Sequence, residues 1–277
     1  MIPCVVLVML VSGAFLWGAV EGTAAETSPI EERLQRLEIQ VMQERGRRLY
    51  REACAPCHGI DGNGQGPAAQ ALQPKPQDFT QGVYKFRTTP IDAMPTDDDL
   101  LRSISEGIPG TAMPAWKRLL SISQRQAVAQ YLKTFAADKF TAQAKTSTTS
   151  LQLPTAPVLT SDRIVRGQAI YERLQCWQCH GRSGRGNGPL AAALRDGKNR
   201  PIRPQNFTKG IYKSGPAPED LLRTILTGLA GTPMPAWSSA LSIEEGWDLV
   251  YYVRSLSRAK TLWRILFVHT GEATPGR

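Results

Sequence analysis

The stretch Cys54-Ala55-Pro56-Cys57-His58 recurs as Cys176-Trp177-Gln178-Cys179-His180, so the pattern Cys-x-x-Cys-His occurs twice. The two copies use four of the five cysteines and two of the three histidines in the chain. In such a pattern the thiols form thioethers with the vinyl groups of a haem, and the adjacent imidazole reaches the iron as an axial ligand. The sequence therefore predicts two covalently attached c-type haems, with His58 and His180 as iron ligands.

Paired cysteines also occur in zinc sites, redox-active dithiols and structural disulfides. A zinc site would need both pairs in one tetrahedron, yet Cys176 lies 122 residues after Cys54. A thioredoxin-like dithiol needs a βαβ setting, and no strand-like run surrounds either motif. A disulfide gives no reason for the histidine that follows each pair. Haem attachment accounts for both the cysteines and the histidines.

The chain is an internal duplication, because four further segments of the first half return in the second half in the same order. Two copies are too few for a stacked repeat array, so we expect two homologous domains. The matched segments are Gly64-Gln65-Gly66-Pro67 with Gly186-Asn187-Gly188-Pro189, 79–85 with 207–213, Asp99-Leu100-Leu101-Arg102 with Asp220-Leu221-Leu222-Arg223, and 110–116 with 231–237.

Helical patterns dominate both halves, and no run alternates long enough to indicate a sheet. We therefore expect an all-α protein with two tandem domains, each a small helical bundle around a haem. Helices are predicted before each haem motif, from Thr96 to Gly107, from Pro218 to Gly228, and after the capping boxes Ser121-x-x-Gln124 and Ser242-x-x-Glu245. The expected organisation is an N-terminal segment 1–25, a first domain 26–137, an extended linker 138–161, a second domain 162–257 and a tail 258–277.

Methionine is the candidate for the second axial ligand of each iron. Of the six methionines, only Met113 and Met234 occupy matched positions, 55 residues after His58 and 54 after His180. The proline that follows each one fixes the backbone of the loop and removes a competing N–H donor. Soft core packing is the alternative use of a methionine. The duplication favours His/Met ligation at both irons.

These elements, a leading helix, Cys-x-x-Cys-His, Gly-Pro, and Met-Pro before a final helix, resemble the class I cytochromes c. Residues 46–256 are similar to the two-domain, two-haem members of that group. The resemblance implies that a proline carbonyl accepts the imidazole N–H, a role that falls on Pro67 and Pro189. It also implies that Trp116 and Trp237 pack near the haems. The candidate partners of the haem propionates are Tyr84, Lys85, Arg87, Tyr212 and Lys213.

We expect an electron-transfer protein, because an iron held by two protein ligands has no open position for a substrate. A two-haem peroxidase would need an openable iron and often a further histidine, and His269 is the only other histidine. A thiosulfate oxidase would use a cysteine ligand, and Cys4 alone lies outside the motifs. A dedicated haem subunit of a larger membrane or molybdenum-containing oxidoreductase stays open beside a free shuttle. In either case we expect the haem edges to lie close together.

The ends and the charge of the chain bear on its location and partners. Residues 2–20 are almost continuously apolar and precede Thr23-Ala24-Ala25, which is typical of a secretory signal and predicts a periplasmic protein. A run of that length could also serve as an uncleaved membrane anchor. The net charge of +9 favours acidic redox partners. Basic residues are dispersed along the chain, so nucleic acid is not an expected partner.

Overall fold

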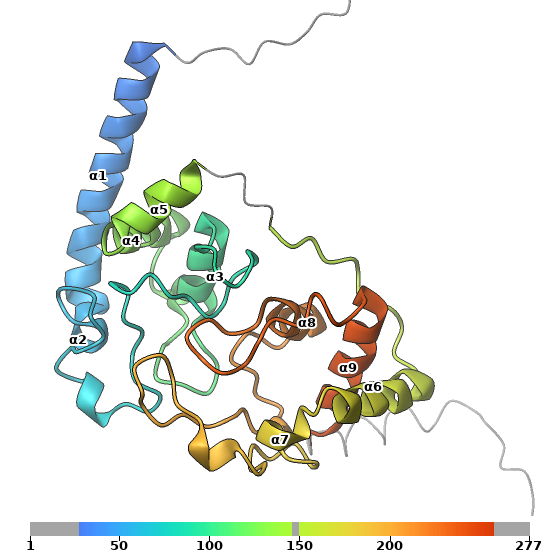
Figure 1. Ribbon diagram of the computed structural model, residues 1–277. Helices are drawn as coiled ribbons and strands as arrows, with labels where there is room; N and C mark the ends of the chain where they lie inside the picture. The colour runs from blue at the N-terminus through green and yellow to red at the C-terminus, as the bar shows by residue number, and fades with distance from the viewer. Residues whose placement is uncertain (1–27, 146–149, 258–277) are drawn as a thin grey trace, which may run out of the picture. The chain divides into compact units, whose positions relative to one another are not determined.

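The computed structural model describes residues 28–145 and 150–257. Regular structure in these residues is helical, apart from one isolated bridge between Arg195 and Pro201, which confirms the all-α prediction (Figure 1). The helices are α1 (Pro29–Ala53), α2 (Ala55–His58), α3 (Asp97–Glu106), α4 (Ile122–Thr134), α5 (Ala137–Ala144), α6 (Ser161–Arg173), α7 (Trp177–His180), α8 (Pro218–Thr227) and α9 (Ile243–Ser255).

Helix ends follow the local capping chemistry that the sequence predicts. The Thr96 side chain accepts a hydrogen bond from the Asp99 N–H at the start of α3, and Gly107 follows its last residue. Ser121 and Ser242 cap α4 and α9 in the same way, each within a complete capping box. Capping of this kind satisfies N–H groups that have no partner inside the helix.

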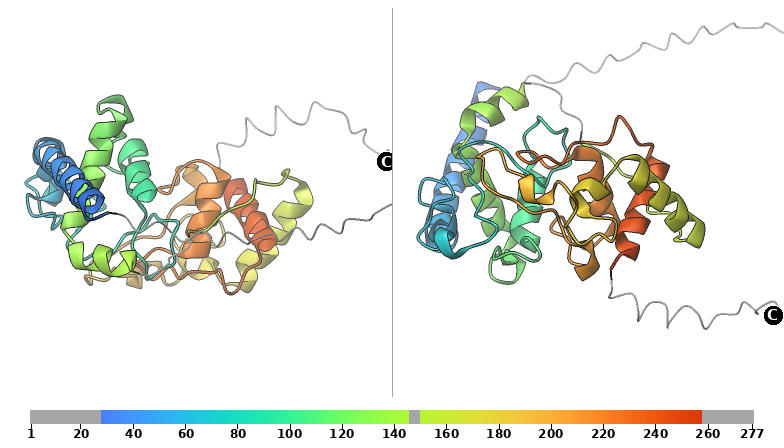
Figure 2. Two further views of the ribbon diagram at one scale, coloured as in Figure 1. Left: turned by 90° about the horizontal axis from the view of Figure 1, so that it is seen from above. Right: turned by 60° about the horizontal axis from the view of Figure 1, so that its bottom comes forward.

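In each domain the helix that leads into the haem motif crosses the last helix at a glycine. A Cβ atom built on Gly46 of α1 would lie 2.0 Å from the carbonyl oxygen of Ala127 in α4. In the second domain, a Cβ atom built on Gly167 of α6 would lie at the same distance from the Asp248 carbonyl oxygen of α9, and the two helices cross each other (Figure 2). Only glycine permits backbones to approach so closely. The crossings fix the helices that lead into the haem motifs.

Two separate apolar clusters form the cores, one in each domain. Both clusters include the tyrosine that precedes the haem motif, the phenylalanine and tyrosine of the matched 79–85 and 207–213 segments, and apolar residues of the last helix. The first contains Tyr50, Phe79, Tyr84, Met94, Leu100, Ile104, Val128 and Leu132, and the second Tyr171, Phe207, Tyr212, Leu221, Leu222, Ile225, Leu226, Trp247, Leu249, Val250 and Val253.

The prediction of an extended linker over 138–161 is wrong at its N-terminal end. Helix α5 occupies Ala137–Ala144, and Phe140 packs on the first core with its ring 6.0 Å from that of Tyr84. The Lys139 ammonium donates a hydrogen bond of 2.6 Å to the Gln81 carbonyl. One aromatic contact and side-chain hydrogen bonds to a distant loop order this helix. A segment rich in Ala and Thr gives no periodic signal for such contacts.

Several sequence-based predictions lie outside the described residues. These are the secretory signal or anchor in 1–25, Cys4 within it, and the tail 258–277 with His269.

Among the helices of the described residues, none has the length and apolar character needed to cross a bilayer. On α1, Gly46 and Tyr50 are buried whereas Val41 is 70% exposed, so only the C-terminal part of this helix packs on the first core.

Candidate haem sites

The two Cys-x-x-Cys-His motifs fold in the same way, each on a single helical turn. The loop after the first motif folds back onto it, because the Gly64 N–H donates to the His58 carbonyl at 2.8 Å and the Gly66 N–H to the Cys57 carbonyl at 3.1 Å. The second loop repeats both bonds from Gly186 and Gly188 at the same distances. The glycine-rich loops therefore bind the motif backbone and leave the cysteine and histidine side chains free for a ligand.

The imidazole of each motif is held by a glutamine carbonyl, which corrects the role assigned to Pro67 and Pro189. Nδ1 of His58 lies 3.0 Å from the Gln77 carbonyl oxygen, and Nδ1 of His180 lies 3.2 Å from that of Gln205. Both prolines are exposed. With Nδ1–H donating to a carbonyl, Nε2 keeps its lone pair and can bind a metal.

The physical reason for this correction is the segment that follows the Gly-Pro loop. It returns across the loop, and the Phe79 N–H donates to the Gly62 carbonyl at 2.7 Å, as Phe207 does to Gly184. This return places the carbonyl of Gln77, two residues before Phe79, beside the His58 imidazole. The repeated Pro-Gln dipeptide was visible in the sequence, but a backbone acceptor leaves no side-chain signature.

Aromatic side chains that sequence reasoning left without a role surround each histidine. The Phe79 ring stacks on the His58 ring at 4.7 Å between centroids, and Phe207 stacks on His180 at 4.5 Å. These rings fix the plane of each imidazole. The duplication itself carried the signal, because both phenylalanines lie in matched segments.

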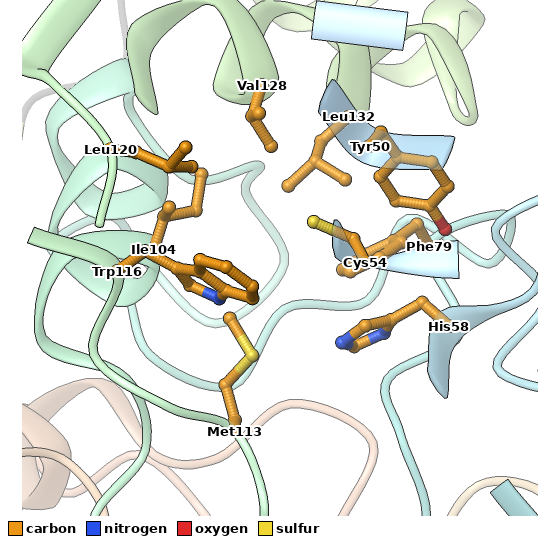
Figure 3. Close-up of a pocket in the computed structure, with 10 residues that line it drawn as sticks. All are labelled: Tyr50, Cys54, His58, Phe79, Ile104, Met113, Trp116, Leu120, Val128 and Leu132. Atoms are coloured by element: carbon orange, nitrogen blue, oxygen red, sulfur yellow. The ribbon is translucent and has the colours of Figure 1, made fainter. Parts of the chain in front are cut away.

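Met113 and His58 point into one apolar pocket of the first domain (Figure 3). The walls of the pocket come from α1, α2, α3, α4 and the loop that carries Met113. Met94 lies in the core and does not line this pocket. The other residues that line it are Tyr50, Cys54, Phe79, Ile104, Trp116, Leu120, Val128 and Leu132.

The methionine loop of each domain is closed by the same hydrogen bonds. The Ile108 N–H donates to the Met113 carbonyl at 3.1 Å, and the Leu229 N–H donates to the Met234 carbonyl at 3.1 Å. Met234 packs against the second core, as do Cys176 and Trp237. The structure therefore places the predicted methionine and tryptophan of each domain at the core that contains its haem motif.

Burial sets the protonation of the motif side chains. It lowers the pKa of His58 and His180, which favours the neutral imidazole that a metal requires. It raises the pKa of the Cys54 thiol to about 12 and that of Cys176 to about 11, so neither favours the thiolate form that zinc binding needs. Within the described ranges, no cluster of three His, Cys, Asp or Glu side chains could hold a metal ion.

Buried hydrogen-bond donors without a protein partner indicate whether a haem fits these sites, because a bound haem could supply the missing acceptors. The hydroxyls of Tyr84 and Tyr212 and the indole N–H of Trp116 are buried, without a hydrogen-bond partner in the described residues. An unpaired buried donor costs about 1–3 kcal/mol. Burial also lowers the pKa of Lys85 and Lys213 beside the two tyrosines. Acceptor oxygens with negative charge, such as haem propionates, match these donors, so the residues fit a haem in each domain.

Arg87, the remaining candidate for a propionate, has a different set of partners. This side chain is 2% exposed and donates to the carbonyls of Tyr84 at 3.0 Å, Pro90 at 2.9 Å and Thr227 at 2.9 Å. Thr227 is the last residue of α8 in the second domain, where a cation suits the helix dipole. Arg87 therefore joins the two domains.

A family model described as cytochrome c oxidase, cbb3-type, subunit III matches residues 41–132 and 162–253. The chain belongs to this family. Its two cytochrome c domains, each with a cysteine pair, imply two covalent haems and a role in electron transfer. This confirms the resemblance to two-domain cytochromes c that the sequence indicated.

Relatives of this cytochrome include subunits of larger assemblies. The cbb3-type cytochrome c oxidase subunit CcoP of Azospirillum sp. (strain B510) is 27% identical over 223 residues, 78% of this chain and 62% of the relative. The chain thus spans about three fifths of that relative. Cytochrome c55X of Paracoccus denitrificans is 31% identical over 90 residues, 32% of this chain and 71% of its own length. A chain of the Kuenenia stuttgartiensis reducing HAO-like protein complex is 42% identical with a TM-score of 0.73, covering 78% of this chain and 96% of the other.

Proposed function

We propose that this cytochrome transfers electrons through two haems, with His58 and Met113 as axial ligands of one iron and His180 and Met234 as those of the other. The shared pocket of His58 and Met113 carries the proposal, because an imidazole and a thioether point into one apolar space (Figure 3). A bound haem supplies the Fe(III)/Fe(II) couple. His58 and Met113 would hold the iron between them, and the apolar walls of the pocket would keep water away from it.

The rest of each site holds its group in place. The four cysteines form the thioether bonds, and the Gln77 and Gln205 carbonyls orient the imidazoles. The buried hydroxyls of Tyr84 and Tyr212 would donate hydrogen bonds to the haem propionates. The described cysteines all belong to the two motifs, so none of them is free to serve as the distal ligand of a thiosulfate oxidase.

We further propose that the protein acts as the haem subunit of a larger oxidoreductase complex. The relative from the reducing HAO-like protein complex supports this, because 42% identity extends over 96% of its chain. The curated relatives that are named as oxidase subunits point the same way. We place the protein on the periplasmic side, since residues 2–20 are typical of a signal or an anchor. The net charge of +9 suits an acidic docking partner.

Optical spectroscopy of the purified holoprotein tests the ligation. We expect low-spin haem at both sites and the weak sulfur-to-iron charge-transfer band at the red end of the ferric spectrum. A high-spin resting haem, or hydrogen peroxide turnover at enzymatic rates without a partner, would contradict an electron carrier.

Affinity purification of the tagged protein from its native cells tests the assembly. We expect it to co-purify in fixed stoichiometry with another redox protein that is rich in acidic surface residues. Recovery of a free monomer in the soluble fraction, at low and at physiological salt, would instead identify a shuttle.

A further inference from the structure

The two domains contact each other through equivalent residues that are exchanged. A Cβ atom built on Gly231 would lie 2.9 Å from Cγ1 of Val83, and one built on Gly110 would lie 3.1 Å from Cγ2 of Ile211. Val83 and Ile211 occupy matched positions in the duplication, and so do the two glycines. Each domain therefore presses an aliphatic side chain onto a glycine of the other, as in an interface with twofold symmetry.

Both glycines lie in the loops that carry the candidate methionine ligands. Gly110 has a φ of +74° and Gly231 a φ of +72°, a region in which other residues are strained. Each follows the start of a turn that closes on Met113 or Met234 through the backbone bonds described above. The aliphatic contact therefore falls on a methionine loop, three residues before the methionine itself.

At their other end, the two aliphatic residues are fixed to the histidine side of their own domain. The Gln77 side-chain amide donates to the Val83 carbonyl at 2.7 Å, and that of Gln205 donates to the Ile211 carbonyl at 2.8 Å. The backbone carbonyls of the same glutamines hold the imidazoles. A continuous set of contacts thus runs from each histidine to the methionine loop of the opposite domain.

Polar contacts around this set keep the domains together. Arg102 donates to the Ser214 carbonyl at 3.2 Å and pairs with Asp220 of the second domain. Lys198 of the second domain pairs with Asp78, the neighbour of Gln77. With these ties in place, Val83 and Ile211 have little freedom to withdraw from the loops.

We propose that Val83 and Ile211 are positioning residues that act across the interface: Val83 holds the loop of Met234, and Ile211 holds the loop of Met113. The proposal rests on the His/Met ligation of the proposed function. A loop that is blocked from moving outward keeps its thioether at the iron, so each domain secures the ligand of the other.

The two loops differ in the support that they receive from their own domain. In the second domain Phe207 follows Gly186 by 21 positions, whereas Phe79 of the first domain follows Gly64 by 15. Within the longer segment, the Gly197 N–H donates to the Gly231 carbonyl at 3.0 Å and braces the Met234 loop. Among the described residues, no equivalent backbone hydrogen bond braces the Met113 loop, so removal of Ile211 should have the larger effect.

The test compares Val83→Ala with Ile211→Ala in the full holoprotein. The readouts are the methionine S-methyl proton signals of the ferrous protein and the rate of cyanide binding to each ferric haem, assigned with Met113→Ala and Met234→Ala. We expect Ile211→Ala to broaden or shift the Met113 signal and to accelerate cyanide binding at that haem about fivefold to tenfold, because the loop loses its aliphatic contact with the second domain. We expect Val83→Ala to act on the Met234 haem, with a smaller factor.

Matched controls separate positioning from general destabilisation. Ile211→Val retains the Cγ2 methyl that faces Gly110 and should behave as the wild type, and Val165→Ala makes the same change as Val83→Ala at a position that is 66% exposed. An effect of Ile211→Ala confined to its own haem, or equal at both haems, would overturn the inference. Wild-type protein without two methionine signals would instead overturn the proposed ligation.

Discussion

The two domains present nearly the same residues to their haem sites and different residues to each other. Around the histidines, a glutamine carbonyl, a stacked phenylalanine and a buried tyrosine recur with closely similar distances. At the interface the pattern breaks. In the first domain 13 residues separate Lys85 from Asp99 and include Arg87, whereas 6 separate Lys213 from Asp220.

This difference shows which contacts each function requires. Each domain must hold the same group, a haem, so the residues around the two histidines are alike. A joint between two domains needs complementary partners, so Arg87 and Arg102 of the first domain meet a carbonyl and a carboxylate of the second. The exchanged contacts of Val83 and Ile211, by contrast, keep the twofold relation between the two domains.

The largest effect is expected from substitutions that make the two haem sites different from each other. Met113→Ala should lower the potential of the first haem by on the order of 0.1 V, because loss of the thioether removes a ligand that favours the reduced iron. Met234→Ala should do the same at the second haem only. Potentiometric titration with optical detection measures both. Met94→Leu is the control, since Met94 lies outside the pocket, and a change there with an unaltered Met113→Ala spectrum would reassign the ligand.

The next effect concerns Arg87, which has no counterpart in the shorter segment of the second domain. Arg87→Met should lower the free energy of unfolding by about 2–4 kcal/mol, because several buried carbonyls, including that of Thr227, lose their donor. Denaturant unfolding followed by tryptophan fluorescence measures this. The exposed Arg118→Met should change it by less than about 0.5 kcal/mol. Equal midpoints for the two variants would contradict a joining role for Arg87.

A smaller effect sharpens the contrast between matched arginines of α3 and α8. Both Arg102 and Arg223 pair with Asp220, but Arg102 reaches it from the other domain and Arg223 lies 3.3 Å away within the same helix. A double-mutant cycle with Asp220→Asn should give a coupling of about 1–2 kcal/mol for Arg102→Ala. For Arg223→Ala we expect less than about 0.5 kcal/mol. A larger coupling energy for Arg223 than for Arg102 would mean that Asp220 stabilises its own helix more than the domain interface.

The smallest effect is expected from Asp78→Asn, which gives the first domain the residue that the second domain has at the matched position, Asn206. Burial raises the pKa of Asp78, but hydrogen bonds from Lys198 and Thr80 outweigh it and leave the pKa below its ordinary value. Its ion pair therefore stabilises the fold above about pH 4, and the contribution is lost as the pH falls through the lowered pKa. Asp78→Asn should cost up to about 1 kcal/mol at neutral pH and little at pH 3.

The matched position supplies the control for that experiment. Asn206 of the second domain accepts the Thr208 N–H at 3.0 Å, as Asp78 accepts the Thr80 N–H at 2.9 Å. Asparagine at 78 therefore keeps the turn and removes only the charge. Stability measured against pH should converge for wild type and variant in acid, and parallel curves would exclude the ion pair as the cause.

Much of this protein was predictable because its signals are local. The cysteine motifs, the helix caps at Thr96, Ser121 and Ser242, and the glycine that ends α3 depend on residues a few positions apart. The duplication added a second signal, since Met113 and Met234 stand out only when the halves are aligned. The helix α5 escaped prediction because Phe140 makes it stable through a contact with Tyr84, far away in the sequence.

The sequence by itself determined two haem motifs, two homologous helical domains and one candidate methionine in each, because side-chain chemistry and spacing are written in the chain. Tertiary structure alone decided that Gln77 and Gln205 hold the imidazoles in place of Pro67 and Pro189, and that Val83 and Ile211 meet the loops of the opposite domain. The physical reason is that every residue carries a carbonyl and many carry an aliphatic side chain. Which of them meets a partner depends on how distant segments pack.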